Sequence, residues 1–195
     1  RTTRERRRLG LGIIPADRQR EALLLDATLW ENRILGHQDG PPLVRGPWLD
    51  RGVARAQTAA IVREADVRTP GIDVAAYALS GGNQQKLIVG RELSGEPRVL
   101  IAVHPTRGVD VGAQAAIWTR LVAARDEGLA VLLLSADLHE LIGLSARVLV
   151  MLRGAIVAVL DPAAVTPETL GRAMTGLDPA PATSPAPGRP DAPPA

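Results

Sequence analysis

Leu79–Lys86 reads LSGGNQQK, and this short stretch decides how the rest of the chain is interpreted. Ser80 is a typical helix N-cap, and the two glycines after it let a backbone come very close to a ligand. The helix predicted to begin there includes Gln84 to Leu93. Because the first N–H groups of a helix have no acceptor within it and lie at the positive end of its dipole, this position suits an anion. A Ser-Gly-Gly loop that merely caps a helix is the alternative interpretation of these residues taken alone.

The stretch that follows predicts a layered α/β fold. Val99–Val103 is a continuous apolar run, which indicates a buried parallel strand, and Ala130–Leu134 is a second one. Between them, Ala113–Glu127 has the pattern of an amphipathic helix with Ile117 and Leu121 on one face. Strands that alternate with helices favour a mostly parallel sheet covered by helices.

The region before the motif is different, since it is mainly helix and loop. Leu11–Ile14 predicts a short strand, Thr28–Leu35 a short helix, and Gly36–Pro47 a loop rich in glycine and proline. Asp50 is a plausible N-cap for a helix that runs to about Asp66. A helical insertion between two sheet-forming halves explains this arrangement.

The C-terminal part predicts a small helix-and-hairpin segment. Leu138–Leu144 has a helical pattern, and two apolar strands flank the turn signal Arg153-Gly154. Thr166 is a cap for a last helix over Pro167–Met174. After Leu177 the chain is dominated by proline and alanine, which cannot bury enough apolar surface to order itself.

Composition narrows the class of protein. Hydrophobic residues make up 46% of the 195 residues, so the chain can bury a sizeable core, and that apolar content is nearly all aliphatic. There is no cysteine, which excludes disulfides and thiolate metal sites. The formal net charge is only +2, and the basic run Arg1–Arg8 has no interleaved aromatic residues, so a nucleic-acid partner is not expected.

These motifs together resemble a known family. Leu79–Lys86 is similar to the signature motif of ABC transporter ATPases, and Val99–Asp110 resembles their Walker B strand with its D-loop. The Asn-Gln-Gln-Lys ending, with Thr106–Ala113 (TRGVDVGA), is similar to the second ATPase half of bacterial sugar and nucleoside importers. The Q-loop region of those second domains is similar to Glu5–Asp17, Arg18–Glu21 and Ala27–Leu35.

The resemblance covers roughly Arg4 to Gly176 and implies a fold and a domain organisation. The implied fold is α/β, an incomplete P-loop NTPase-like ABC ATPase domain over residues 1–176 with a helical insertion at about 28–93. Residues 177–195 are expected to form a disordered tail.

Four departures from the family pattern concern one nucleotide site. No G-x-x-x-x-G-K-[ST] P-loop occurs, and the resemblance places that motif upstream of Arg1. The Mg²⁺-associated aspartate maps to Val103 and the catalytic glutamate to His104, which is either a base working near neutral pH or a substitute in a degenerate site. The switch histidine maps to Ala136 and the Q-loop glutamine to Ala16.

An intact signature beside a degenerate site has a functional meaning in this family. Its ATPase domains are expected to dimerise head to tail, so the signature would serve the partner domain's ATP. ATP and Mg²⁺ would therefore belong to the complete dimer and are not expected to bind this chain alone. The residues expected at the opposing ATP are Ser80, Gly81, Gly82, Asn83, Gln84 and Asp110.

The function that the resemblance implies is the coupling of ATP hydrolysis to import of a sugar or nucleoside. The expected partners are a second ATPase domain in the same polypeptide, membrane permease subunits and, indirectly, a solute-binding protein. The expected location is the cytoplasmic face of the cell membrane. Two alternatives remain open: an ABC protein of DNA repair or translation, and an interaction domain that no longer takes part in an ATP cycle.

Overall fold

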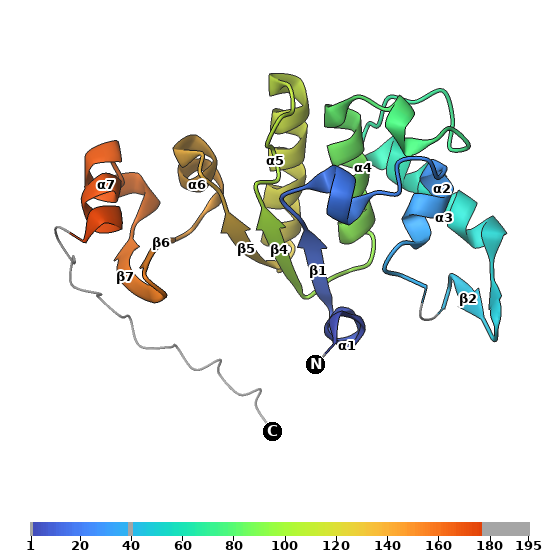
Figure 1. The fold of residues 1–195 in the computed structure, drawn as a ribbon, viewed down its shortest axis with the longest axis horizontal. Helices are drawn as coiled ribbons and strands as arrows, with labels where there is room; N and C mark the ends of the chain where they lie inside the picture. The colour runs from blue at the N-terminus through green and yellow to red at the C-terminus, as the bar shows by residue number, and fades with distance from the viewer. Residues whose placement is uncertain (1, 39–40, 177–195) are drawn as a thin grey trace. The chain divides into compact units, whose positions relative to one another are not determined.

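The structure is a computed structural model that describes residues 2–38 and 41–176. It divides into two compact units, Arg1–Ala136 and Asp137–Ala195, and each is described by itself (Figure 1). The predicted tail at 177–195 lies outside the described residues. The boundaries expected for the ATPase domain (1–176) and for its helical insertion (about 28–93) stay predictions.

A three-stranded parallel sheet is the centre of the first unit. Its strands are β1 (Leu11–Ile14), β4 (Val99–Val103) and β5 (Ala130–Leu134), in the order β1-β4-β5. The strands that flank β4 come from distant parts of the sequence, and both run parallel to it. The predicted α/β fold with a parallel sheet is confirmed.

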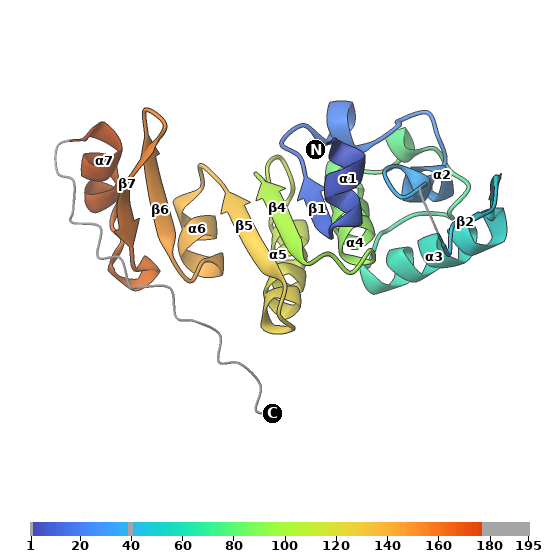
Figure 2. The same ribbon diagram turned by 90° about the horizontal axis from the view of Figure 1, so that it is seen from below.

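The sheet is buried on one face only. Leu100 and Ala102 of β4 and Ile14 of β1 are fully buried. The helices that lie beside this sheet in Figures 1 and 2 are α4 (Gly81–Leu93) and α5 (Val111–Asp126). On β5, Leu132 is 49% and Leu134 45% exposed. The prediction that both apolar runs are buried strands is therefore wrong in part: β4 is half-buried, and β5 is an edge strand.

The predicted helical region contains two helices that begin at side-chain caps. Thr28 and Glu31 form a capping box at the start of α2 (Leu29–Ile34), and Asp50 accepts a hydrogen bond from the Val53 N–H at the start of α3 (Arg51–Glu64). Part of the predicted Gly36–Pro47 loop is instead paired. A short hairpin of β2 (Val44–Arg45) and β3 (Trp48–Leu49) lies there, and the remaining elements of this unit are α1 (Thr3–Arg8), η1 (Arg18–Ala22) and η2 (Ala76–Ala78).

A glycine brings α3 and α4 together. A Cβ atom built on Gly90 of α4 would lie 2.7 Å from Cγ2 of Ile61 and 3.3 Å from Cβ of Ala65. Real Cβ contacts are almost never that short, so only glycine allows this approach. The helical region is thereby fixed to α4, the helix that also packs against β1.

The second unit is a hairpin with three short helical elements. β6 (Val148–Leu152) and β7 (Ala155–Leu160) pair antiparallel, and both Arg153 and Gly154 have positive φ, as a tight two-residue hairpin turn requires. Val150, Ala158 and Ala173 form its core. The helical elements are α6 (Leu138–Leu144), η3 (Pro162–Ala164) and α7 (Pro167–Thr175).

Candidate functional site

The N-terminus of α4 presents the predicted signature residues. Ser80 is the N-cap, and its Oγ accepts hydrogen bonds from the Asn83 backbone N–H at 3.4 Å and from Asn83 Nδ2 at 2.9 Å. Ser80 is exposed, and the N–H groups of Gly81 and Gly82 that follow have no acceptor within the helix. An exposed hydroxyl beside unpaired first-turn N–H groups is an arrangement that can bind an anionic oxygen.

The second glycine of the motif lies against the start of α5. A Cβ on Gly82 would lie 2.9 Å from the Ala113 Cβ and 3.0 Å from the Asp110 Oδ2. Asp110 is the N-cap of α5, and its Oδ1 accepts from the Ala113 N–H at 2.9 Å. The predicted signature and D-loop residues therefore meet, and two helix N-termini lie side by side.

Asp110 is held as a carboxylate by these contacts. Hydrogen bonding from the Ala113 N–H is the largest influence that lowers the pKa of Asp110, and the nearby Lys86 charge lowers it further. The side chain is exposed and ionised at neutral pH. It places one negative charge beside the glycines, so an anion bound there must approach Ser80 from the side away from Asp110.

Arg18, which the resemblance placed in the Q-loop region without a role of its own, joins these two motifs. It begins the π-helical turn η1, whose N-cap Asp17 accepts from the Gln19 and Arg20 N–H groups. Its Nη1 donates to the Arg107 carbonyl at 2.8 Å, and its Nη2 lies 2.5 Å from where a Cβ of Gly81 would be. The signals for this position in the sequence are the cap at Asp17 and the Q-loop resemblance of Arg18–Glu21, and neither identifies the contact with Arg107.

Gln84 faces inward instead of toward the exposed end of α4. It is 3% exposed, its Nε2 donates to the Ala76 carbonyl at 3.1 Å, and its Oε1 accepts from Gln19 Nε2 at 3.4 Å. The Asn83 amide is also engaged, because its Oδ1 accepts from the Arg68 N–H at 2.8 Å. These two amides fix the helix start to the preceding segments. At that start Ser80 is exposed and Gly81 is half-buried, whereas Gly82 is buried against the start of α5.

His104 lies at the end of β4 in a left-handed conformation with φ of 49°. Its N–H donates to the Leu134 carbonyl at 2.8 Å, and its Nδ1 accepts from the Ala136 N–H at 3.4 Å. The structure thus brings together the two positions where the resemblance expects a glutamate and a histidine. His104 is half-buried, so its ring is partly available to solvent.

These positions do not fit a magnesium ion. Mg²⁺ prefers carboxylate oxygens, and Val103, His104 and Ala136 offer none from their side chains. Within residues 2–38 and 41–176, no three His, Cys, Asp or Glu side chains are grouped so that they could hold a metal ion. No step of a reaction is therefore assigned to a metal held by this chain.

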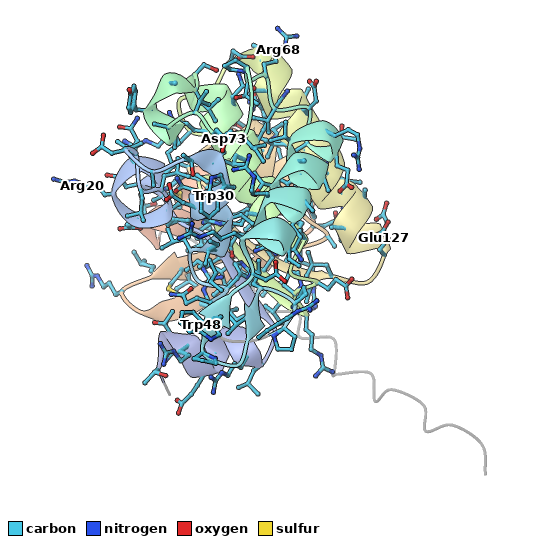
Figure 3. The ribbon with its side chains drawn as sticks, turned by 90° about the vertical axis from the view of Figure 1, so that its right-hand side faces the viewer. Arg20, Trp30, Trp48, Arg68, Asp73 and Glu127 are labelled. Carbon is cyan, nitrogen blue, oxygen red and sulfur yellow. The ribbon has the colours of Figure 1, made fainter. Side chains whose placement is uncertain are left out.

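An aromatic and charged surface covers the helical region. Arg55 lies over the Trp30 ring, 5.9 Å from its centroid, and forms an ion pair with Asp73, which Figure 3 shows beside Trp30. Trp48, at the hairpin, is 76% exposed. Among the described residues no helix combines the length and apolar character needed to cross a membrane.

Comparison with known proteins identifies relatives over most of the chain. It is 43% identical over 167 residues to the guanosine import ATP-binding protein NupO of Bacillus subtilis, and 42% identical over 166 residues to the nucleoside import ATP-binding protein NupA of Lactococcus lactis. The ribose import ATP-binding protein RbsA 2 of Streptomyces avermitilis is 37% identical over 167 residues. These matches cover 85–86% of this chain, which spans about a third (33%) of the length of each relative.

The fold has a counterpart among solved structures. A dimeric ATP-binding cassette, MJ0796, in a post-hydrolysis state bound to ADP and Pi, superposes with a TM-score of 0.66 at 19% identity, over 81% of this chain and 65% of the other. No protein-family model matches the chain. The predicted resemblance is confirmed: the chain is a homologue of one part of the ATP-binding proteins of nucleoside and sugar importers, and its fold is that of an ABC ATPase domain.

Proposed function

We propose that this chain supplies the signature motif to an ATP site that is completed by a second ATPase domain. The observation that carries the proposal is the N-terminus of α4, where Ser80 is exposed and is followed by the Gly81 and Gly82 N–H groups, which have no acceptor within the helix. Donors fixed in this way can stabilise the charge on a γ-phosphate during phosphoryl transfer without reorganising. Gln84 and Asn83 act by holding the helix start in place.

In the proposed dimer, ATP is hydrolysed only at the site that the partner domain and this chain's signature form together. ATP with Mg²⁺, bound in the complete dimer, supplies the phosphoryl group that is transferred to water. This chain's own Walker B positions, Val103 and His104, provide no carboxylate for Mg²⁺, and the Nδ1 atom of His104 already accepts a hydrogen bond from Ala136. Its role is to bind and orient the partner's nucleotide, with Asp110 at the junction of the two domains.

The names of the relatives favour import of a nucleoside or a sugar as the process that ATP hydrolysis drives. Their names specify guanosine, nucleoside and ribose import. We therefore infer that the complete protein binds permease subunits at the cytoplasmic face of the membrane and depends on a solute-binding protein for its cargo. The surface proposed for the permease contact lies within Glu21–Gly36 and Trp48–Asp66. Trp48 is exposed there, and Arg55 lies over the Trp30 ring; Figure 3 labels Trp30 and Trp48.

The test is a substitution in the full-length protein. Ser80→Arg puts a long cationic side chain where the γ-phosphate is proposed to lie, and we expect both ATPase activity and solute uptake to be lost. Ser94→Arg is the matched control, because Ser94 is exposed at the other end of the same helix. If Ser80→Arg leaves both rates at the level of Ser94→Arg, the composite site is wrong and the chain is a non-catalytic interaction domain.

A further inference from the structure

A pocket lies at the other end of β1 from Arg18. Its volume is about 260 Å³, several times the roughly 30 Å³ that one water occupies in the liquid. Gly10, Leu11 and Gly12 form one wall, at the start of the strand, whereas the residues that follow the strand lead to the candidate ATP site. The pocket is therefore separate from the site described above.

Positive charge dominates this pocket. Arg7 and Arg8 line it, and the carboxylate among its described lining residues is that of Glu92. Glu92 is fully buried and already accepts from Arg7 Nη1 at 2.9 Å and from Arg91 Nε at 3.1 Å. One carboxylate thus balances two guanidinium groups, which leaves the charge of Arg8 without compensation from Glu92.

Arg33 adds a further buried cation near the Glu92 carboxylate, which already pairs with Arg7 and Arg91. It is 5% exposed, and its Nε and Nη1 atoms are buried without a hydrogen-bond partner in the described chain. Burial is the main influence that lowers the pKa of Arg33 and Arg91 adds to it, while Glu92 opposes them, so these three charges lie close together. A guanidinium stays protonated in proteins, and a buried one without an anion is costly.

His37, one turn beyond Arg33, contributes a polar atom without a partner. It lines the pocket, and its Nε2 is buried with no hydrogen bond. Burial, followed by the Arg33 charge, lowers the pKa of His37 to about 4, so the ring is neutral at physiological pH. A neutral imidazole carries one N–H, and it can donate to a bound anion without adding a further charge to the pocket.

We propose that this pocket is a binding site for a small tetrahedral oxyanion of the phosphate or sulfate class, contacted by Arg7, Arg8 and His37 and balanced by the buried charge of Arg33. Forked guanidinium donors match the several oxygens of such an ion better than a single point charge does. Gly36 keeps the Arg7 guanidinium within the wall, since a Cβ there would lie 3.0 Å from its Cζ. The proposal is independent of the ATP site, because it uses none of that site's residues.

The test is calorimetric titration of the chain with sodium phosphate at constant ionic strength, with sulfate and acetate as further arms. We expect saturable binding of one phosphate, similar binding of sulfate, and about tenfold weaker binding for Arg8→Ser, which removes one charged donor. Arg6→Ser is the matched control, since Arg6 is an exposed arginine of the same helix that does not line the pocket. It is expected to leave the dissociation constant within about twofold, as a screened surface charge should.

Arg33→Gln is expected to abolish binding. If that variant does not fold, the comparison of Arg8→Ser with Arg6→Ser still tests whether the pocket binds phosphate. The NMR signals of the His37 ring give a second test, because they should shift on addition of phosphate but not of chloride. Three results would overturn the proposal: no saturable phosphate binding, equal weakening by Arg6→Ser and Arg8→Ser, or acetate binding as tight as phosphate. The last result would assign the pocket to a carboxylate.

Discussion

Arg18 Nη1 donates a 2.8 Å hydrogen bond to the backbone carbonyl of Arg107, a contact that spans 89 positions of sequence. The same guanidinium lies close to Gly81 of the predicted signature motif. Arg18, at the start of η1, thus connects the loop after β4 to the start of α4. In the proposed function, Arg18 is a positioning residue, since it fixes the backbone of two motifs and acts on the nucleotide only through them.

Replacing Arg18 should loosen the loop that ends at Asp110. In Arg18→Gln the two bonds to the Arg107 and Gly108 carbonyls are lost, and we expect local stability to fall by about 1–2 kcal/mol. Hydrogen exchange read by mass spectrometry should then show faster exchange in residues 104–112. Arg20→Gln is the control, because Arg20 is an exposed arginine of the same turn (Figure 3). Equal exchange in the two variants would contradict this role.

Gly82→Ala should separate the starts of α4 and α5. The new Cβ would lie 2.9 Å from the Ala113 Cβ, so the helices must move apart, at a cost of about 1–3 kcal/mol. Gly171→Ala, the same change in α7 at a position with no neighbour within 4 Å, should instead stabilise by about 0.5–1 kcal/mol. Urea denaturation followed by circular dichroism measures both. A Gly82 variant as stable as the parent chain would show that this contact is not tight.

The elements that could be predicted from sequence are those with a local signal. Ser80, Asp50 and Thr28 start helices because their side chains accept hydrogen bonds from N–H groups two or three residues on, which depends only on neighbouring residues. The Arg153-Gly154 turn was predicted for the same reason, since its positive φ values suit a short hairpin. The signature and D-loop residues were predicted by resemblance, and the structure brings Gly82 and Asp110 of these two segments together.

What could not be predicted depends on contacts between distant segments. An apolar run shows that a strand is hydrophobic but not whether both faces are covered, so Leu132 and Leu134 were expected to be buried and are not. Arg18, Arg33 and Glu92 look like ordinary solvated charges in the sequence. Their roles come from partners such as Arg107 and Arg7, which lie 89 and 85 positions away.

Glu92→Gln should destabilise the first unit strongly. Burial raises the pKa of Glu92, but Arg91, Arg7 and the Ile13 N–H together hold it below its ordinary value, so the carboxylate form stabilises the fold. Removing it leaves Arg91 buried and unpaired, at a cost of about 3 kcal/mol at pH 7. Because the folded-state pKa is lowered, the parent chain loses this contribution as pH falls through that value in acid. Urea titrations at pH 7 and pH 3 should therefore show a large difference that shrinks in acid; a constant difference would contradict the ion pairing.

His37 should make the parent chain less stable in mild acid. Its pKa of about 4 in the fold lies below the ordinary 6.5, so between those values the unfolded chain binds a proton that the folded chain does not. Stability should fall as pH decreases from about 6.5 to 4, and His37→Gln should remove that part of the slope. Thermal melts in phosphate-free buffers across this range measure it. Parallel pH profiles for the parent and the variant would show that His37 is not buried in a neutral form.

The central claim is that the start of α4 contacts the nucleotide of a partner domain while Val103 and His104 do not serve a site of their own. The most direct measurement is photo-crosslinking of the full-length protein with an ATP analogue that carries its reactive group on the γ-phosphate, followed by peptide mapping. The account predicts label within Leu79–Lys86, and loss of that label in Ser80→Arg but not in Ser94→Arg. Label confined to the segment around Val103 and His104, with none on Leu79–Lys86, would contradict it.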